Sequence, residues 1–443
     1  MSISADEFVE LMKDSPTNYP MQALQRQADA LLIYQSVLQN EIGQAFLALL
    51  ETFIAPRDER AALQAYGRWF RALADQNLGW QDYLCHEIAQ AENPFTRQVQ
   101  HTNLADLPLA LVTAVQQDLR SLQALYHCPP TQLSQWLREI STCPTPPVPW
   151  ASTITATDLL PSLQQAEDWG TALADLATHY RQQGTGLFAR YRALRWQAGQ
   201  LMGVAYPDPG RLSDLAGHEW QREQLIKNTE FLLAGLPALH VLLYGSRGSG
   251  KSSLVKALLQ EYGDRGLRLV EVAKTDLADL PAILDRLRQV PQKFILFVDD
   301  LSFEEDDDAF KALKVVLEGG LTARPQNIVV YATSNRRHLI REFFADRPRP
   351  SAGDEVHSWD TVQEKLSFSD RFGLTLTFEP ADQKTYLAIV HHLATRHAIC
   401  LAPDDLEHRA LQWATRHNGR SGRTARQFID FLKADLTLTQ ETP

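Results

Sequence analysis

The residues of this chain best suited to chemistry lie in a glycine-rich run that follows an apolar stretch. Residues 241–253 read Val-Leu-Leu-Tyr-Gly-Ser-Arg-Gly-Ser-Gly-Lys-Ser-Ser, which has the G-x-x-x-x-G-K-S spacing of a phosphate-binding P-loop. Glycines allow backbone angles that turn successive amide N–H groups toward phosphate oxygens, and a following helix aims its positive dipole end at the same anion. The alternative, an ordinary glycine- and serine-rich turn, is disfavoured by the strand-like run before it and the helical run after it.

The residues of this loop are expected to hold the phosphates of a nucleotide together with Mg²⁺. Lys251 can reach the β- and γ-phosphates, and the Ser252 hydroxyl can hold the metal ion. The predicted phosphate-binding set is Gly245, Ser246, Arg247, Gly248, Ser249, Gly250, Lys251, Ser252 and Ser253.

A second apolar run, residues 294–298, ends in the adjacent acids Asp299 and Asp300. This is the Walker B arrangement, in which Asp299 would help to hold Mg²⁺ and Asp300 would orient or activate the attacking water. Glu304 and Glu305 are weaker candidates for the base, because their acidic run also reads as a solvated loop before a helix.

A third apolar run, residues 328–333, leads into Ser334 and Asn335. An asparagine at a strand tip can hydrogen-bond both the γ-phosphate and the attacking water. Ser-Asn after a strand is also ordinary turn chemistry, so this signal is weak alone.

Five β-prone runs must position these residues: 240–244, 267–272, 294–298, 328–333 and 374–378. Helical stretches separate the first four, and this alternation predicts an α/β fold with a five-stranded parallel sheet covered on both faces. From about residue 381 onward the pattern is helical only.

The N-terminal half reads as helices, for example residues 23–38 and 42–54, with apolar residues at three- and four-residue spacing. A proline-rich break near 143–149 interrupts the pattern, which resumes from about 158 to 202. A turn-rich segment, residues 206–210, marks the next boundary. We therefore expect a helical N-terminal domain (1–205), a nucleotide-binding core (206–380) and a helical C-terminal domain (381–443).

Composition indicates a soluble globular protein of the cytoplasm. The net charge of −11 argues against nonspecific coating of nucleic acid. No apolar run of about 18 residues is present, and the acidic N-terminus lacks a signal core, so neither a membrane span nor secretion is expected. The four scattered cysteines suit a reducing compartment. Basic clusters at 336–341 and 409–426 read either as solvated helix faces or as phosphate-sensing segments.

The order of these motifs resembles that of an AAA+ ATPase. After the P-loop, the Asp-Asp strand and the Asn-tipped strand come Asp370-Arg371-Phe372-Gly373 and a helical tail with the G-R-x-x-R pattern at 419–423. More narrowly, the chain resembles a bacterial branch of AAA+ P-loop NTPases grouped as a domain of unknown function. That match runs nearly end to end, through the strings at 80–84, 92–95, 191–196, 228–231, 299–305 and 332–339.

The resemblance implies an αβα sandwich with an all-helical lid and assigns further roles. Asn335 resembles sensor 1, and Arg423 the sensor 2 arginine that reaches the nucleotide from the lid, with Arg426 as the other candidate. Arg371 resembles the arginine finger that enters a neighbouring subunit's site, although a salt bridge with a carboxylate such as Asp370 is the alternative. Residues 212–217, which include Gly217, resemble the segment that packs against adenine.

The resemblance implies an ATP hydrolase with Mg²⁺, a homo-oligomer with shared active sites, that remodels a protein or protein–nucleic-acid partner. The N-terminal helical domain is large enough to dock a protein partner; nucleic acid is possible, and a membrane is not expected. The loop at 273–279 has no aromatic residue, which counts against a polypeptide-threading unfoldase. A slow nucleotide-dependent binding switch stays open as the alternative, because Asp300 stands where many such ATPases have Glu. No N-K-x-D motif supports a GTPase.

Overall fold

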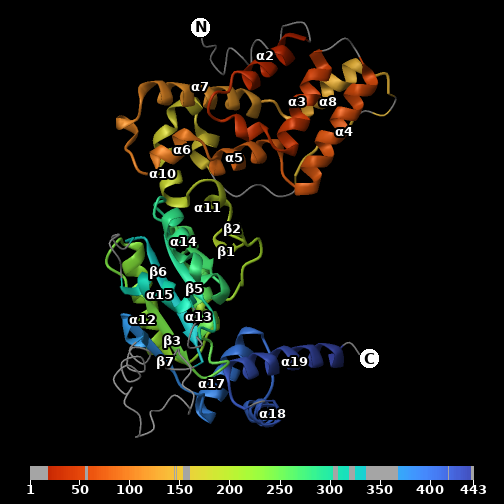
Figure 1. Ribbon diagram of the computed structural model, residues 1–443. Helices are drawn as coiled ribbons and strands as arrows, with labels where there is room; N and C mark the ends of the chain where they lie inside the picture. Colours follow the sequence, from red (N-terminus) through yellow and green to blue (C-terminus); the bar gives the residue numbers. More distant parts are fainter. Residues whose placement is uncertain are drawn as a thin grey trace. The chain divides into compact units, whose positions relative to one another are not determined.

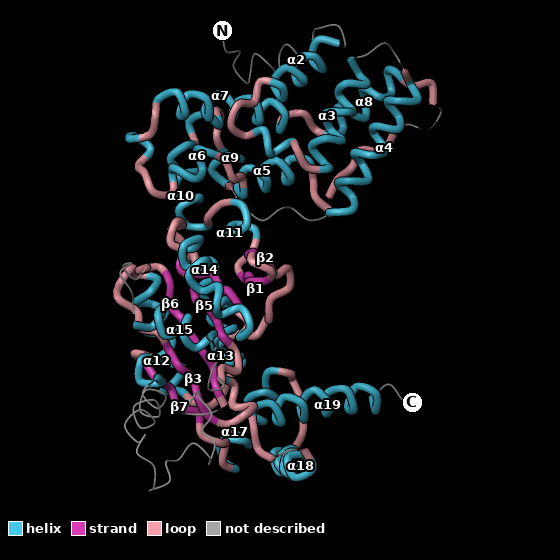
Figure 2. The backbone as a smooth tube through the Cα atoms, viewed as in Figure 1, coloured by secondary structure: helices cyan, strands magenta, loops and turns pink. Residues whose placement is uncertain are grey.

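The computed structural model describes residues 18–54, 58–143, 145, 147–152, 160–302, 308–318, 325–335, 368–417 and 419–440. The chain divides into two compact units, Met1–Arg190 and Tyr191–Pro443 (Figures 1 and 2). Over the described ranges, no helix combines the length and the apolar character that crossing a membrane requires.

The described part of the first unit is built from helices around one hydrophobic core. Trp69 and Trp80 are fully buried there, and the Trp80 ring stacks on Phe46 with the ring centroids 4.1 Å apart. The α-helices are α2 (Asn18–Asp29), α3 (Glu41–Ile54), α4 (Glu59–Gln76), α5 (Trp80–Gln90), α6 (Pro94–Val99), α7 (Leu109–Tyr126), α8 (Pro130–Ile140), α9 (Pro161–Gln165), α10 (Leu173–Gln183) and α11 (Gly186–Arg190). The 3₁₀ turns are η1 (Gln35–Leu38), η2 (Leu104–Asp106) and η3 (Trp169–Thr171).

The helix predicted over residues 23–38 is wrong in its second half, because α2 ends at Asp29 and only the short turn η1 follows. The cause is Asp118 on α7, which is 0% exposed. Its carboxylate accepts hydrogen bonds from the backbone N–H groups of Leu32 (2.9 Å) and Tyr34 (2.8 Å). These contacts satisfy amides that a continuing helix would have used internally, so the chain turns here.

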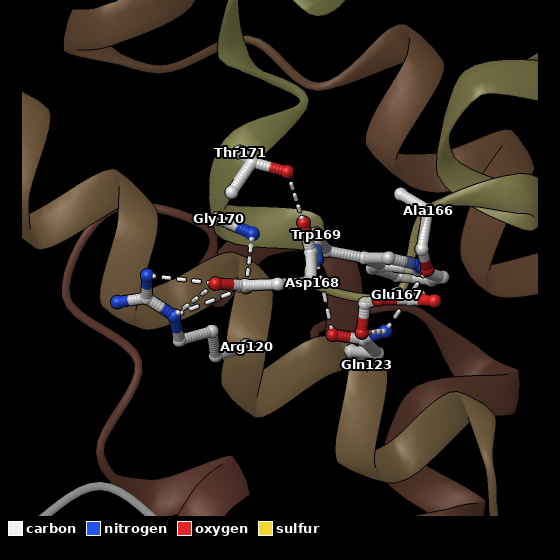
Figure 3. Close-up of polar contacts among 8 residues, drawn as sticks. All are labelled: Arg120, Gln123, Ala166, Glu167, Asp168, Trp169, Gly170 and Thr171. Atoms are coloured by element: carbon white, nitrogen blue, oxygen red, sulfur yellow. Dashed lines mark hydrogen bonds and ion pairs between the residues drawn. The ribbon is translucent and has the colours of Figure 1, made fainter. Parts of the chain in front are cut away.

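A second loop, residues 166–171, is fastened to the same helix (Figure 3). The Gln123 amide donates to the carbonyl of Glu167 at 2.9 Å and accepts from the N–H of Trp169 at 3.0 Å. Arg120 forms an ion pair with Asp168 at 2.9 Å. The loop thereby buries Trp169 to 1% exposure against the Tyr126 ring. Tryptophans 69, 80, 136 and 169 are thus core residues of this unit.

The second unit contains a seven-stranded sheet with the order β2-β1-β4-β5-β6-β3-β7. All neighbouring strands are parallel except β1 and β2. The strands are β1 (Ala193–Gln197), β2 (Gln200–Gly203), β3 (Val241–Gly245), β4 (Leu267–Glu271), β5 (Lys293–Val298), β6 (Ile328–Ser334) and β7 (Leu374–Phe378). Each of the five predicted β-prone runs therefore forms a strand, within one residue of its expected bounds.

Strands β1 and β2 correct the sequence analysis, which extended a helical pattern to residue 202. They form an antiparallel hairpin that turns at Ala198 (φ 50°) and Gly199 (φ 76°). Two consecutive residues with positive φ make the tight turn that suits the twist of a hairpin. The missed signal is the alternation along β1, where Trp196 is buried and its neighbours Arg195 and Gln197 are exposed.

Helices cover both faces of the sheet. Helices α12 (Glu219–Leu233) and α13 (Lys251–Tyr262) share one hydrophobic cluster with alternate strand residues such as Leu243 and Phe297. The chain moves across the sheet in one direction from β3 to β4, and in the opposite direction from β4 to β5 and from β5 to β6. Right-handed crossovers therefore place α14 (Leu280–Leu287) and α15 (Asp308–Glu318) on the other face.

The C-terminal helices α17 (Gln383–Arg396), α18 (Pro403–Arg416) and α19 (Gly422–Gln440) pack around a separate small core, drawn in blue in Figure 1. We call these helices the lid. The 3₁₀ turns in the described ranges of this unit are η4 (Leu212–Asp214), η5 (Gly263–Arg265), η6 (Lys274–Asp279) and η8 (Phe368–Arg371). The predicted fold class is confirmed as α/β, with a mostly parallel sheet, helical N-terminal and C-terminal parts, and two strands more than expected. The division at residues 205 and 380 stays a prediction.

Candidate functional site

Three loops meet at the carboxyl edge of the sheet because of the order of its central strands. β6 lies between β3 and β5, with Tyr244 paired to Ser334 and Val298 paired to Ala332. Parallel strands end at the same edge, so the P-loop after β3, the two acids after β5 and Asn335 after β6 become neighbours. The strand order, which the sequence does not contain locally, is what assembles the site.

The P-loop has the backbone angles that its glycines were expected to supply. The φ angles are 141° at Gly245, 75° at Gly248 and 93° at Gly250. At Gly245 a side chain is also excluded sterically, since a Cβ there would lie 1.9 Å from the carbonyl oxygen of Phe378 on β7. That carbonyl accepts the N–H of Ser246 at 3.0 Å, which ties the start of the loop to the sheet.

Helix α13 begins at Lys251, and its N-cap Gly250 makes no side-chain capping hydrogen bond. The first-turn N–H groups of α13 are therefore left for an anion, as in a P-loop. Ser249 closes the loop by donating to the Ser246 carbonyl at 2.9 Å. Arg247 is exposed.

The Lys251 ammonium group lies inside this loop. Its Nζ donates to the carbonyl oxygens of Ser246 (2.7 Å) and Gly245 (3.0 Å), and lies 3.4 Å from Oδ1 of Asn335. Burial lowers the pKa of Lys251, while the charges of Asp299 and Asp300 oppose that change. Because the ammonium group is held by carbonyl oxygens of the loop, it can exchange them for phosphate oxygens when a nucleotide binds.

Ser252 and Asp299 form the pair expected to hold a metal ion. The Ser252 hydroxyl donates to Oδ1 of Asp299 at 2.6 Å. Mg²⁺ prefers oxygen ligands and commonly takes only one or two from the protein, with phosphates and water supplying the rest. A hydroxyl and a carboxylate side by side at the phosphate-binding loop fit that requirement.

Asp300 and Asn335 are directly bonded, since Nδ2 of Asn335 donates to Oδ1 of Asp300 at 2.5 Å. Asp300 has a left-handed backbone, with φ of 52°. Sequence reasoning missed the residue beside them: the Thr333 hydroxyl donates to Oδ1 of Asp299 at 2.5 Å and accepts the N–H of Asp300 at 3.0 Å. The sequence does contain a signal for this role: Thr333 carries a hydroxyl group and lies two positions before Asn335, the predicted sensor 1.

The lid reaches the P-loop through the first turn of α19. The N–H of Arg423 donates to the Gly248 carbonyl at 3.1 Å. A Cβ on Gly248 would lie only 3.1 Å from Cβ of Arg423, so the two segments are in close contact. The positive charge of Arg423 also contributes to the lowered pKa of Lys251. Arg423 thus lies on the lid beside the phosphate-binding loop.

The segment predicted to face adenine lies between the core and the lid. Leu212 belongs to the core cluster, whereas a Cβ on Gly217 would meet Thr385 of α17 at 3.4 Å. The next residue, His218, was not singled out by the sequence analysis. Its ring lies 4.9 Å from the Phe378 ring, centroid to centroid, and burial lowers its pKa.

Arg371 is the predicted site residue that the structure places away from this edge. It ends η8, three residues before β7 begins. In the β3–β7 pairing, Leu374 is opposite Val241 and Phe378 is opposite Gly245. Arg371 therefore lies at the amino edge of the sheet, with the length of β3, roughly 13 Å, between it and the P-loop.

Some predicted features lie outside the described residues. These are the alternative bases Glu304 and Glu305 and the basic cluster at 336–341.

Comparison with known proteins gives one family match and several similar structures. A family described as "Protein of unknown function (DUF815)" matches residues 189–436, more than half of the chain. A mutant of RuvB from Thermotoga maritima is 17% identical, with a TM-score of 0.38, covering 52% of this chain and 68% of its own. AMPPCP-bound DnaA from Aquifex aeolicus is 18% identical, with a TM-score of 0.37, covering 52% and 66% respectively.

Proposed function

The chain belongs to the DUF815 family, and on that premise we propose that it binds ATP with Mg²⁺ and hydrolyses it to ADP and phosphate. One observation carries the proposal. Lys251, the Ser252–Asp299 pair and the Asp300–Asn335 pair meet at one edge of the sheet, joined by hydrogen bonds of 3.4 Å or less. In the proposal Lys251 is the cation that binds phosphate, Ser252 and Asp299 bind the metal ion, and the Asn335 amide orients the acid Asp300.

In the proposed reaction the P-loop N–H groups and Lys251 hold the β- and γ-phosphates. Mg²⁺ bound by Ser252 and Asp299 would neutralise charge on those phosphates. Asp300 accepts a proton from a water whose oxygen attacks the γ-phosphorus while the bond to the ADP oxygen breaks. Asn335 holds Oδ1 of Asp300 by its amide, which leaves Oδ2 to take the proton.

The position of Arg371 implies that the active protein is an oligomer. Because Arg371 lies at the opposite edge of the sheet from its own P-loop, it can act on phosphates only in a second copy of the chain. A head-to-tail contact of this kind closes into a ring when the rotation between subunits allows it. We propose such an oligomer, working in the cytoplasm, with the N-terminal helical unit docking the protein or protein–nucleic-acid partner that is remodelled.

A slow nucleotide-dependent switch is the second candidate, and the Asp300–Asn335 bond favours it. At 2.5 Å this bond occupies one carboxylate oxygen of an acid that is already one methylene shorter than glutamate. An acid held back from the γ-phosphate would give slow turnover while ATP still ordered the lid through Arg423.

ATP turnover per subunit over a wide range of protein concentration separates the candidates. For the shared-site ATPase, specific activity rises with concentration and falls roughly 10³–10⁵-fold in Arg371→Ala, while ATP binding persists. Arg71→Ala, whose side chain is 84% exposed in the first unit, is the matched control and keeps full activity. A slow rate that depends on neither concentration nor Arg371 would favour the switch.

A further inference from the structure

Thr333 occupies a position where its hydroxyl is not needed for the strand. It is the sixth of seven residues in β6, is 2% exposed, and follows Val329, Val330 and Tyr331 in a fully buried run. Valine has nearly the same shape and, like threonine, is β-branched and enriched in strands. A threonine here, at the edge where the site lies, therefore places one hydroxyl group inside an apolar strand end.

The Thr333 hydroxyl forms hydrogen bonds with both acids. It has one proton, which it donates to Oδ1 of Asp299 at 2.5 Å, and its lone pairs accept the N–H of Asp300 at 3.0 Å. The Thr333 carbonyl also accepts the N–H of Leu301 at 2.7 Å. Thr333 alone thus holds three consecutive residues just beyond the end of β5.

The three contacts explain how adjacent acids serve different partners. Asp299 is turned toward Ser252, at 2.6 Å, whereas Asp300 is turned toward Asn335, at 2.5 Å. Between these two side chains the backbone of Asp300 is left-handed, with φ of 52°, a region that is uncommon for non-glycine residues although Asp enters it more often than most. Thr333, on the neighbouring strand, accepts the N–H groups of Asp300 and Leu301 and so holds the backbone on both sides of this turn.

We infer that Thr333 is a positioning residue, which sets Asp299 for Mg²⁺ and Asp300 for the attacking water. The inference rests on the proposed function, because it assigns the two acids those roles. Thr333 itself contacts neither phosphate nor water in this scheme. Its effect passes through the two carboxylates, as a hydrogen-bond partner of a metal ligand tunes that ligand.

The test compares Thr333→Val, which removes the hydroxyl and keeps the shape, with Thr333→Ser, which keeps the hydroxyl. The full chain is used throughout. We expect Thr333→Val to lower ATP turnover roughly 10- to 100-fold, and to raise by a similar factor the Mg²⁺ concentration that half-saturates binding of a non-hydrolysable ATP analogue. Binding of that analogue without Mg²⁺ should stay unchanged, and Thr333→Ser should behave like the wild type.

Thr229→Val is the matched control, since it removes another buried hydroxyl, one that is hydrogen-bonded to a side chain of β6, the strand that carries Thr333. Thr229 lies on helix α12 and is 0% exposed, and its Oγ1 lies 3.0 Å from the hydroxyl of Tyr331 on β6. Thr229→Val should lower the thermal midpoint and leave the Mg²⁺ dependence alone.

Two results would overturn the inference. The first is wild-type Mg²⁺ dependence in Thr333→Val. The second is a Thr333→Ser variant as defective as Thr333→Val, which would mean that packing matters and not the hydroxyl. If the wild type binds the analogue but hydrolyses no ATP at any concentration, the proposed hydrolysis fails, and the Mg²⁺ dependence of binding still decides the role of Thr333.

Discussion

Replacing Gly245 with alanine tests how the phosphate-binding loop is joined to the sheet. The added Cβ would lie 1.9 Å from the carbonyl oxygen of Phe378 and 2.7 Å from its carbonyl carbon. These are backbone atoms of β7, which pairs with β3 along its whole length, so they cannot rotate away. The substitution must therefore separate β3 from β7 or change the φ of 141° at residue 245.

The size of the effect follows from three costs. A side chain in a sparsely populated backbone region costs about 1–3 kcal/mol. Forcing an extra methyl group into packed structure costs about 1–3 kcal/mol. Moving the Phe378 carbonyl away from the N–H of Ser246 loses a hydrogen bond worth about 1 kcal/mol. Together the local stability of the β3–β7 edge should fall by about 3–7 kcal/mol, a large share of the 5–15 kcal/mol typical of a domain.

Native-state hydrogen exchange measured by mass spectrometry on the full chain is the suitable assay, because it reports each strand separately. Peptides covering β3 and β7 should exchange roughly 10²–10⁵-fold faster in Gly245→Ala, at about 1.4 kcal/mol for each factor of ten. The non-hydrolysable ATP analogue should also bind more weakly, since Ser246 moves with the strand.

Gly67→Ala is the control, with the opposite sign. Gly67 lies on the exposed side of α4, and a Cβ there meets nothing within 4 Å. Alanine should stabilise that helix by about 0.5–1 kcal/mol and slow its exchange. If the β3 and β7 peptides of Gly245→Ala exchanged at the wild-type rate, the predicted loss of stability would be refuted. That result would mean that the two strands accommodate the added Cβ at almost no cost in free energy.

Three further predictions concern Asp300, the lid and an ion pair of the first unit. Asp300→Asn should lower single-turnover ATP hydrolysis roughly 10²–10⁴-fold with analogue affinity unchanged, and undiminished hydrolysis would remove Asp300 from the role of base. Arg423→Ala should weaken ATP binding by about 1.5–3 kcal/mol, measured by calorimetry against the exposed lid control Lys433→Ala, and equal affinities would contradict a phosphate contact by Arg423. Hydrogen bonding from Arg120 lowers the pKa of Asp168 in the folded chain from its ordinary value of 3.8. The ion pair therefore stabilises the fold above pH 3.8, and this contribution is lost as the pH falls through the lowered pKa of the folded state. Urea midpoints from pH 6 to pH 2 should therefore fall less in Asp168→Asn than in the wild type, and parallel curves would show that this ion pair adds nothing.

Much of the fold could be predicted because its signals are local. The bounds of β7 agree with the predicted run at 374–378, and the helical run expected after the P-loop forms α13. An apolar run bounded by turn residues, or glycines before a helical run, is read from neighbours in the chain. The hairpin of β1 and β2 was missed because its strands are short and its turn has alanine where Asn or Asp is usual.

The sequence by itself determined the chemistry available to this protein: a P-loop with Lys251 and Ser252, two adjacent acids, and an asparagine at a strand tip. Only the tertiary structure decided which of these residues meet. The strand order places β6 between β3 and β5, so Thr333 can hold both acids, and the parallel pairing of β7 with β3 leaves Arg371 at the amino edge. Asp118 ends a helix by bonding amides 84 to 86 residues away along the chain. Such contacts depend on pairing between distant segments, which the pattern of near neighbours does not encode.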